Sequence, residues 1–475
     1  MVLLNNSCKK TRTLTTGGTL NFSVDTLKFD TVFTAEGSFT TGLLIYNPQD
    51  EEVILSSVRL QDGAASYFHL NVDGFPGNNI PNLKIAAHDS LYVFATVTID
   101  PNNTLTPFII TDSLVATLNG KNFYVPFTAY GQNAHYIIDS VLTTDKKGNS
   151  TIFWNDSLPY VIINSAQINP GTTLKINPGT RVYMHQNSGL VVLGTLQVNG
   201  TATDTVIFQG DRLDRVYFGY MGYPGEWGGI YFGSHSSGSI LSYTRIENCG
   251  NGALSNVQAA IVVYTDSSVH TTADPLQSPQ LFMNNCIVEN SYGYGIYSFQ
   301  GTVVAVNCLV NTTGQQALAV VQGGYDSMVN CTFANYGTAA VTHANSGTVA
   351  ILDYYWDGVP GDPTYYSNLN ASFINCIVYG SLDSEATFDT SGSPAGTSAS
   401  LLLDHCLLKT GTVIEKFVTT NPYILNQDPL FIAPNSGNFD ISSGSPAIGK
   451  GNPAFAPMYN LENKAWHLSV DIGCY

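Results

Sequence analysis

The chain has 475 residues, of which only 11% are charged, and its formal net charge is −17. Residues 1–135 carry 7 basic and 11 acidic side chains, a balance of −4, and the remainder carries 11 basic and 24 acidic ones, a balance of −13. Such an acidic surface repels phosphate backbones and excludes nucleic acid as a partner. The lack of any run of 18 apolar residues excludes a membrane-spanning helix, and 44 Gly with 27 Tyr indicate an all-β protein with many turns.

Residues 1–19 are predicted to form a tether outside the folded part of the chain. The stretch "KTRTLTTGGT" (10–19) has the composition of a flexible linker. Before it, "MVLLNNSCKK" is too short for a signal peptide, but its apolar stub, small residue and Cys-Lys-Lys resemble the end of a bacterial lipoprotein signal. The resemblance implies that Cys8 is lipidated and that the protein is exported to the cell surface or outer membrane, with the lipid as its only contact with the membrane.

Residues 20–135 are predicted to form an immunoglobulin-like β-sandwich. Runs such as "SLYVFATVTID" alternate with period two, and turns such as "NPQDEE" and "LNGKN" separate them. This spacing indicates about seven half-buried strands. The architecture resembles the immunoglobulin-like domains that precede larger surface modules, and it contains no catalytic motif.

Residues 136–475 are predicted to form a right-handed parallel β-helix. Residues 168–210 are a string of short elements that end in "PGT", "GT" or "NGT", which indicates a solenoid with coils of roughly 20–25 residues. The spacing of repeated Asn-Cys pairs gives a second measure of the coil length. The pairs start at Asn248, Asn285, Asn307, Asn330 and Asn375, and His405-Cys406 is a sixth copy. Spacings of 22 and 23 residues mark single coils. We interpret the spacing of 45 as two coils, and those of 37 and 30 as single coils with inserted loops.

The Asn-Cys pairs are best explained as structural. Stacked coils lie about 4.8 Å apart, so distance alone leaves disulfides open. A zinc site needs closely spaced ligands, which are absent, and His405 faces away from its neighbour Cys406 because adjacent strand residues point to opposite faces. Asn tolerates left-handed backbone, and the Cys that follows it can stack inside the solenoid as a small buried hydrophobe.

Residues 158–475 resemble the parallel β-helix proteins of pectate-lyase-like architecture. The resemblance rests on "PGEWGGIYF" (224–232) and on the tail "DPLFIAPNSGNFDISSGSPAIGKG" with its closing "VDIGCY". Together with the lipoprotein-like start and the sandwich, it implies a surface lipoprotein of Bacteroides-type bacteria. It says little about activity, because the architecture serves lyases, hydrolases, adhesins and inert stalks.

The sequence predicts no catalytic residue. Residues 246–408 contain no Lys or Arg and twelve Asp or Glu, so the middle of the solenoid lacks the base that pectate-lyase-like enzymes use and would repel a polyuronate. The basic residues nearest to it are Arg212, Arg215 and Arg245. A hydrolase needs two carboxylates about 5–9 Å apart, and the inserted loop with Asp353, Asp357 and Asp362 offers the candidates. We expect no cofactor and no metal centre, although the oxygen-rich turns are compatible with a structural calcium ion.

Aromatic loops are the strongest functional lead, because sugar rings stack on exposed aromatic side chains and uncharged polar rims suit uncharged glycans. We therefore predict a non-catalytic surface protein that binds a glycan, or adheres through one. The alternatives are a polysaccharide hydrolase or lyase on the same scaffold and a structural stalk, and the sequence does not indicate a protein partner. The candidate glycan-binding residues are Tyr217, Tyr220, Tyr223, Tyr354, Tyr355, Trp356, Tyr365 and Tyr366.

Overall fold

The computed structural model describes residues 12–143, 150–213, 222–252, 256–266, 279–356, 358–359, 364–390, 396–411, 418–466 and 469–475. The chain is all-β and divides between Ala134 and His135 into two compact units, one residue before the predicted boundary. No helix in the described part of the chain has the length and apolar character needed to cross a membrane. The predicted lipidation site, Cys8, lies outside the described residues.

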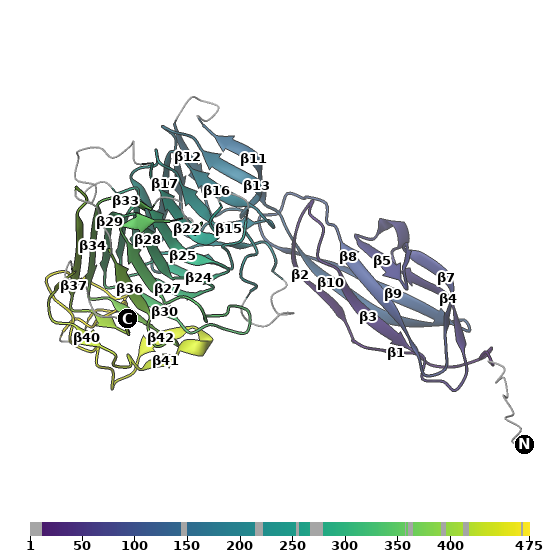
Figure 1. Cartoon of the computed structure of the whole chain (residues 1–475). Helices are drawn as coiled ribbons and strands as arrows, with labels where there is room; N and C mark the ends of the chain where they lie inside the picture. The colour runs from purple at the N-terminus through teal and green to yellow at the C-terminus, as the bar shows by residue number, and fades with distance from the viewer. Residues whose placement is uncertain are drawn as a thin grey trace, which may run out of the picture. The chain divides into compact units, whose positions relative to one another are not determined.

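The first unit contains two five-stranded sheets in its described residues (Figure 1). Side chains from both sheets, such as Leu43, Val93 and Phe127, share one buried core, as expected for a sandwich. All pairs are antiparallel except β2 with β10, which is parallel. In spatial order, one sheet contains β1 (Asn21–Phe22), β3 (Thr41–Tyr46), β8 (Ser90–Val97), β5 (Phe68–Val72) and β6 (Phe75–Pro76). The other contains β2 (Leu27–Phe33), β10 (Lys121–Gln132), β9 (Phe108–Leu118), β4 (Val53–Leu60) and β7 (Asn79–Ile85), and a short 3₁₀ helix, η1 (Gly63–Ala65), joins β4 to β5.

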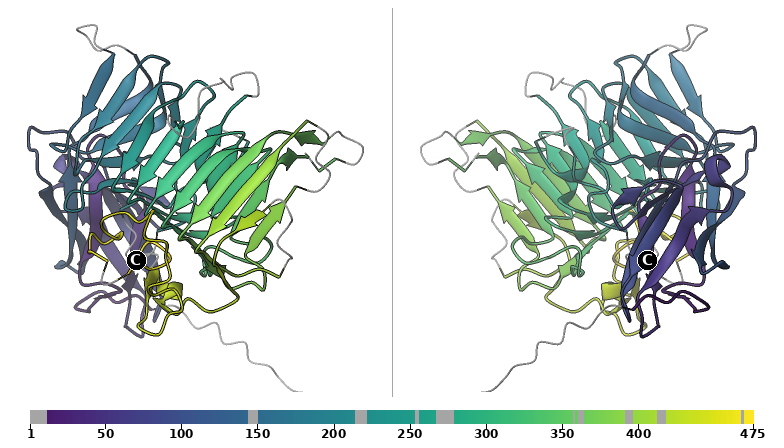
Figure 2. Two further views of the ribbon diagram at one scale, coloured as in Figure 1. Left: turned by 90° about the vertical axis from the view of Figure 1, so that its left-hand side faces the viewer. Right: turned by 90° about the vertical axis from the view of Figure 1, so that its right-hand side faces the viewer.

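The second unit is built from two long parallel sheets, as in a parallel β-helix, and Figure 2 shows strands of successive coils side by side. The larger sheet contains β11 (His135–Leu142), β13 (Tyr160–Ile168), β15 (Arg181–Met184), β16 (Gly189–Val192), β18 (Val206–Gly210), β19 (Ile230–Phe232), β21 (Thr244–Glu247), β22 (Ala259–Tyr264), β24 (Ile287–Ser291), β25 (Tyr294–Phe299), β27 (Leu309–Thr313), β28 (Leu318–Val321), β30 (Thr332–Asn335), β31 (Val349–Leu352), β35 (Ile377–Gly380), β36 (Ala386–Asp389), β38 (Leu407–Leu408) and β40 (Ile424–Leu425). The smaller sheet contains β12 (Thr151–Trp154), β14 (Thr173–Ile176), β17 (Thr195–Asn199), β20 (Ser239–Ser242), β23 (Leu281–Asn284), β26 (Thr302–Val306), β29 (Gly324–Val329), β34 (Leu369–Ile374), β37 (Ala399–Asp404) and β39 (Val418–Thr420).

Four further short strands of the described chain and one 3₁₀ helix lie outside these sheets. A hairpin of β32 (Tyr354–Tyr355) and β33 (Tyr365–Tyr366) projects after β31. Near the C-terminus, β41 (Phe431–Ala433) and β42 (Asn438–Ile441) pair antiparallel around the 3₁₀ helix η3 (Pro434–Ser436).

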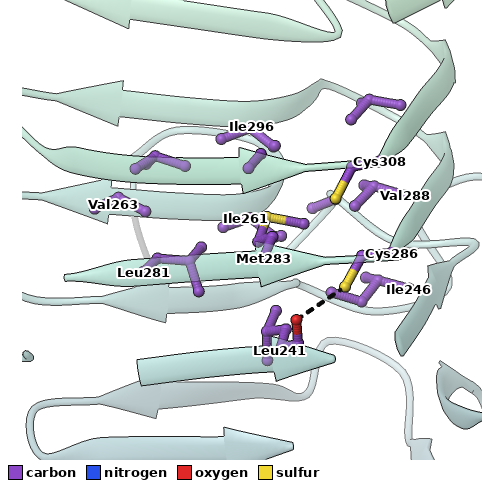
Figure 3. Packing of buried hydrophobic residues seen from close by; sticks show 14 of the residues in the cluster. Leu241, Ile246, Ile261, Val263, Leu281, Met283, Cys286, Val288, Ile296 and Cys308 are labelled. Atoms are coloured by element: carbon purple, nitrogen blue, oxygen red, sulfur yellow. Dashed lines mark hydrogen bonds between the residues drawn. The ribbon is translucent and has the colours of Figure 1, made fainter. Parts of the chain in front are cut away.

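The solenoid core is a continuous stack of apolar side chains from Trp154 to Leu408. It forms because alternate residues of each short strand point inward, and the same inward position recurs on the next coil. Figure 3 shows this stacking for Leu241, Met283 and Ile261, with the thiols of Cys286 and Cys308 among them. The thiol of Cys286 donates to the Leu241 carbonyl at 3.2 Å.

The structural interpretation of the Asn-Cys pairs is confirmed. The Asn residues of all five pairs, and His405, have φ between 49° and 59°. All six Cys residues that follow them are buried and free of disulfides. Burial raises the pKa of the Cys308 and Cys376 thiols well above the usual range, which keeps them neutral and unreactive.

Two details of the predicted spacing are wrong. Thr332 pairs directly with Ile377, so the 45 residues from Cys331 to Cys376 form one coil with long insertions instead of two coils. Cys249 is not in the same column as Cys286, because Arg245 pairs with Ile287 and Asn248 therefore stands level with Asn290. The dipeptide serves two different corners of the solenoid, each of which needs a left-handed residue.

Asn330 and Asn375, which bond each other at one corner of successive coils, also hold the end of the chain in place. We call residues 428–466 and 469–475 the C-terminal strap. The Asn330 amide donates to the carbonyls of Asp471 at 3.3 Å and Gly473 at 3.2 Å, and the Asn375 amide donates to Asn452 at 3.0 Å. Ile472 of the strap is buried against coil residues of the larger sheet. The strap therefore covers one side of the solenoid instead of adding another coil.

Replacing Asn330 with Gly is expected to loosen the strap. Glycine keeps the left-handed backbone but removes two bonds to the strap and the acceptor for the Asn375 amide, at a cost of about 1–3 kcal/mol. Amides of residues 469–475 should then exchange faster in hydrogen–deuterium exchange. Asn285→Gly is the matched control, because its φ is 53° and its side chain has no hydrogen bond to the described strap. Equal exchange in both variants would show that the amide does not hold the strap.

Candidate functional site

A strip of aromatic side chains runs across the outer face of the larger solenoid sheet. It consists of Tyr231, Tyr264, Tyr294, Tyr297, Phe299 and Tyr355, and we call it the aromatic strip. Strands β19, β22 and β25 position the first five, at outward places between core residues such as Ile230, Val263 and Ile296. Because the strands are parallel and in register, outward side chains of successive coils become neighbours.

Ring contacts link the strip from coil to coil. Tyr264 lies between Tyr231 and Phe299, with centroid distances of 6.4 Å and 5.3 Å, and its ring is within 14° of parallel to that of Phe299. The Tyr355 ring meets Phe299 edge-on at 5.5 Å. On β25 itself, Tyr297 contacts Tyr294 at 5.0 Å. The result is a broad face of side-by-side rings, most of which are half-buried.

The strip is uncharged. Strands β19, β22, β25, β28 and β31 contain no Asp, Glu, Lys or Arg. Burial raises the pKa of the Tyr231, Tyr294 and Tyr297 hydroxyls, and neighbouring Tyr264 adds to the shift at Tyr231. These phenols therefore stay protonated and can donate hydrogen bonds at any physiological pH. Such a face suits an uncharged ligand with an apolar side and hydroxyl groups.

Some of the predicted aromatic residues lie on the hairpin of β32 and β33, which contacts the aromatic strip. In the hairpin, Tyr354 lies opposite Tyr366, and Tyr355 opposite Tyr365. The Tyr354 hydroxyl donates to Asp389 at 3.0 Å, and burial together with this carboxylate raises its pKa to about 12. Trp356 and Tyr365 are about half exposed, at 47% and 54%. The hairpin thus extends the aromatic strip through Tyr355.

The other predicted residues, Tyr217, Tyr220 and Tyr223, belong to the segment that precedes β19. Tyr223 is 51% exposed, and its segment packs against the turn at Tyr292, which precedes the first residue of β25. Tyr355 contacts Phe299, the last residue of β25, so the two tyrosines lie near opposite ends of this strand. Tyr217 and Tyr220 lie outside the described residues. Trp227, the tryptophan of "PGEWGGIYF", is fully buried and its indole donates to the Glu247 carbonyl at 2.9 Å.

Sequence reasoning missed Tyr231, Tyr264 and Phe299 because it looked for aromatic residues in loops. The sequence did contain a signal for them, because each lies on a short strand next to a small or apolar residue that points into the core and must therefore point outward itself. Tyr264 and Phe299 stand in register on successive coils. Aligning the coils by register would have brought these rings together.

A buried imidazole–carboxylate pair was also missed. The side chains of His343 and Glu385 are 1% and 0% exposed, with Nε2 and Oε2 3.0 Å apart. The same carboxylate accepts the Thr348 hydroxyl at 2.7 Å, the Thr348 amide at 3.0 Å and the Leu382 amide at 2.6 Å. The Glu385 side chain therefore joins the inserted segment 336–348 to the turn before β36. No local pattern reveals a pair 42 residues apart in the chain.

Of the predicted candidates for catalysis, the structure describes Arg212, Arg245 and Asp353. Arg245 is bonded to Glu247 at 2.7 Å and to Glu289. Although burial lowers the pKa of Arg245, these two carboxylates hold it above its usual value, which leaves Arg245 no capacity as a base. Asp353 is buried, and Arg215, Asp357 and Asp362 lie outside the described residues. Within the described chain, no cluster of three His, Cys, Asp or Glu side chains could hold a metal ion.

Comparison with known proteins does not identify a relative. No protein-family model matches the chain. No curated protein matches it either. Among solved structures, a family 123 glycoside hydrolase from Clostridium perfringens matches 24% of this chain and 26% of its own length, with 10% identity and a TM-score of 0.17. The Salmonella enterica SafA pilin with its SafB chaperone matches 29% of this chain and 62% of its own length, with 14% identity and a TM-score of 0.18. Neither similarity bears on the fold or function of this chain.

Proposed function

We propose that this protein binds a neutral glycan along the aromatic strip. The observation that carries the proposal is the continuous row of rings from Tyr231 through Tyr264 and Phe299 to Tyr355, on strands without a charged residue. The C–H faces of a sugar ring pack on such rings, and the neutral phenols supply hydrogen bonds to hydroxyl groups. An acidic polysaccharide would find no cation in these strands to balance its charge.

The proposal places the protein at the cell surface, held by a lipid on Cys8. Its support is the resemblance of "MVLLNNSCKK" to the end of a bacterial lipoprotein signal and of the whole chain to surface lipoproteins of Bacteroides-type bacteria. In that location, glycan binding would serve adhesion or capture of a polysaccharide.

Replacing Tyr355 with Ala is expected to weaken glycan binding about tenfold or more, since it removes the ring that joins the hairpin to Phe299. Isothermal titration with neutral oligosaccharides such as cello-, manno-, malto- and xylohexaose measures the change. Phe153→Ala is the control, because Phe153 is 61% exposed on β12 of the smaller solenoid sheet. If both variants keep wild-type affinity, the strip is not the binding face.

A carbohydrate-active enzyme on the same scaffold is the second candidate, favoured by one observation. The segment that carries His343 lines a hollow of about 520 Å³ that includes Tyr336, Thr338 and Asn435, and the buried imidazole of His343 is oriented by Glu385. A carboxylate that orients an imidazole is a frequent arrangement for a general base. Release of new reducing ends or unsaturated ends from a polysaccharide by the wild-type chain would favour this candidate over binding alone.

A further inference from the structure

One sheet of the N-terminal sandwich has an exposed face without charges. Strands β1, β3, β8, β5 and β6 contain no Asp, Glu, Lys or Arg. The strands of the opposite sheet carry six charged residues, namely Lys28, Asp30, Arg59, Lys84, Asp112 and Lys121. Both sheets have one face in the same core, so this difference concerns the faces toward solvent. Exposed antiparallel sheets usually carry charges, which prevent unwanted association.

Aromatic rings occupy the middle of this charge-free face. Tyr92 and Phe94 take successive outward positions on β8 and are 56% and 43% exposed. Their centroids are 6.0 Å apart and their planes differ by only 8°. The Phe94 ring leans over β3 at Gly42, where a Cβ would lie 3.2 Å from the ring. Glycine at this position thus leaves room for the ring to lie across the sheet.

Polar groups surround the rings on the same face. Phe94 lines a hollow of about 340 Å³ together with Thr40, His69, Asn71 and Thr96. Asn71 and Phe94 are direct cross-strand partners. The Oδ1 atom of Asn71 has no hydrogen-bond partner although it is shielded from solvent, and such groups are uncommon in native structures. The hollow is within the size range of small-ligand sites and combines apolar rings with a few polar groups.

We propose that this face is a second glycan-binding site, for a neutral oligosaccharide, independent of the aromatic strip. The two exposed rings can pack on a sugar, and the polar side chains of His69 and Thr96 beside them can bond its hydroxyl groups. The absence of charge from all five strands favours an uncharged ligand, because a charged one would lose hydration without gaining an opposite charge. Polar groups beside the rings favour a sugar over an apolar partner surface.

The two sites can be separated in the full-length chain by titration calorimetry with the same hexaoses. Phe94→Ala should abolish one class of sites, Phe299→Ala the other, and the double variant both. His69→Ala, a change at an exposed polar side chain, should weaken the sandwich class alone by at least threefold. Tyr124→Ala is the matched control, since Tyr124 is 54% exposed on β10 of the opposite sheet and should leave binding unchanged.

The outcomes of these titrations support or overturn the sandwich site independently of the aromatic strip. Sites lost in Phe94→Ala but not in Phe299→Ala would support the sandwich site even if the strip binds nothing. Unchanged binding in both Phe94→Ala and His69→Ala would overturn it, whatever the strip does. A wild-type dimer in light scattering that becomes a monomer in Phe94→Ala, without glycan binding at this face, would also overturn it and would make a second copy of the chain the occupant.

Discussion

Replacing Glu385 with Gln is expected to lower the free energy of unfolding of the solenoid by about 3–5 kcal/mol. The Glu385 carboxylate is fully buried and accepts four donors, from His343, Thr348 and Leu382. Glutamine keeps the volume, but its amide group places a donor where donors already converge. The Leu382 amide donates to Oε1 and the Thr348 amide to Oε2, so whichever oxygen becomes the NH2 group leaves one of these backbone amides without an acceptor that water can replace.

Urea denaturation followed by circular dichroism measures this loss. Glu462→Gln is a suitable control, because Glu462 pairs with Lys464 at the surface and its removal should change stability little. A Glu385→Gln variant as stable as wild type would mean that the carboxylate does not join the segment 336–348 to the solenoid. A variant of wild-type stability that had also lost polysaccharide cleavage would instead assign the pair to catalysis.

The second large effect is expected at Asp326 and depends on pH. Asp326 faces the interior of the solenoid, and burial raises its pKa to about 8, although Ser298 and the Val303 amide both donate to it at 3.2 Å. In the unfolded chain an Asp has a pKa of about 3.9. The folded state therefore holds a proton that the unfolded state releases, and stability falls as pH rises from about 4 to about 8, by up to about 1.4 kcal/mol per pH unit.

Asp326→Asn removes the ionisable group while retaining its shape and its acceptor oxygen. At pH 4 the variant and the wild type should have similar stability, and at pH 9 the variant should be more stable by a few kcal/mol. Thermal unfolding at several pH values measures this difference. Parallel stability curves from pH 5 to 9 would show that Asp326 is already ionised in the folded protein.

The coil architecture could be predicted because it follows from local chemistry repeated along the chain. Short strands with inward apolar residues and left-handed Asn corners have to recur with the coil, and they are visible in the sequence. The coil count could not be predicted in the same way. A coil with two long insertions between Cys331 and Cys376 has the same length as two plain coils, and only the pairing of Thr332 with Ile377 distinguishes them.

The candidate sites were only partly predictable, for a related reason. Tyr355 is conspicuous in an aromatic loop, but its neighbour Phe299 is an ordinary strand residue until the register of the coils is known. His343 and Glu385 meet because an inserted segment folds back over the next coil, which is a long-range contact without local signal. On the sandwich, alternation indicates which residues face outward but not that one whole face lacks charge until strands are assigned to sheets.

The most direct measurement for the central proposal is a glycan array probed with the full-length Phe94→Ala chain, which lacks the sandwich site, and with the same chain after Phe299→Ala or Phe153→Ala is added. Phe299 contacts Tyr264, Tyr297 and Tyr355, so its removal interrupts the aromatic strip at its centre. The proposal predicts binding of at least one neutral glycan by the Phe94→Ala chain with or without Phe153→Ala, and a loss of about tenfold or more when Phe299→Ala is added. Binding confined to acidic glycans, or equal binding by all three proteins, would contradict it.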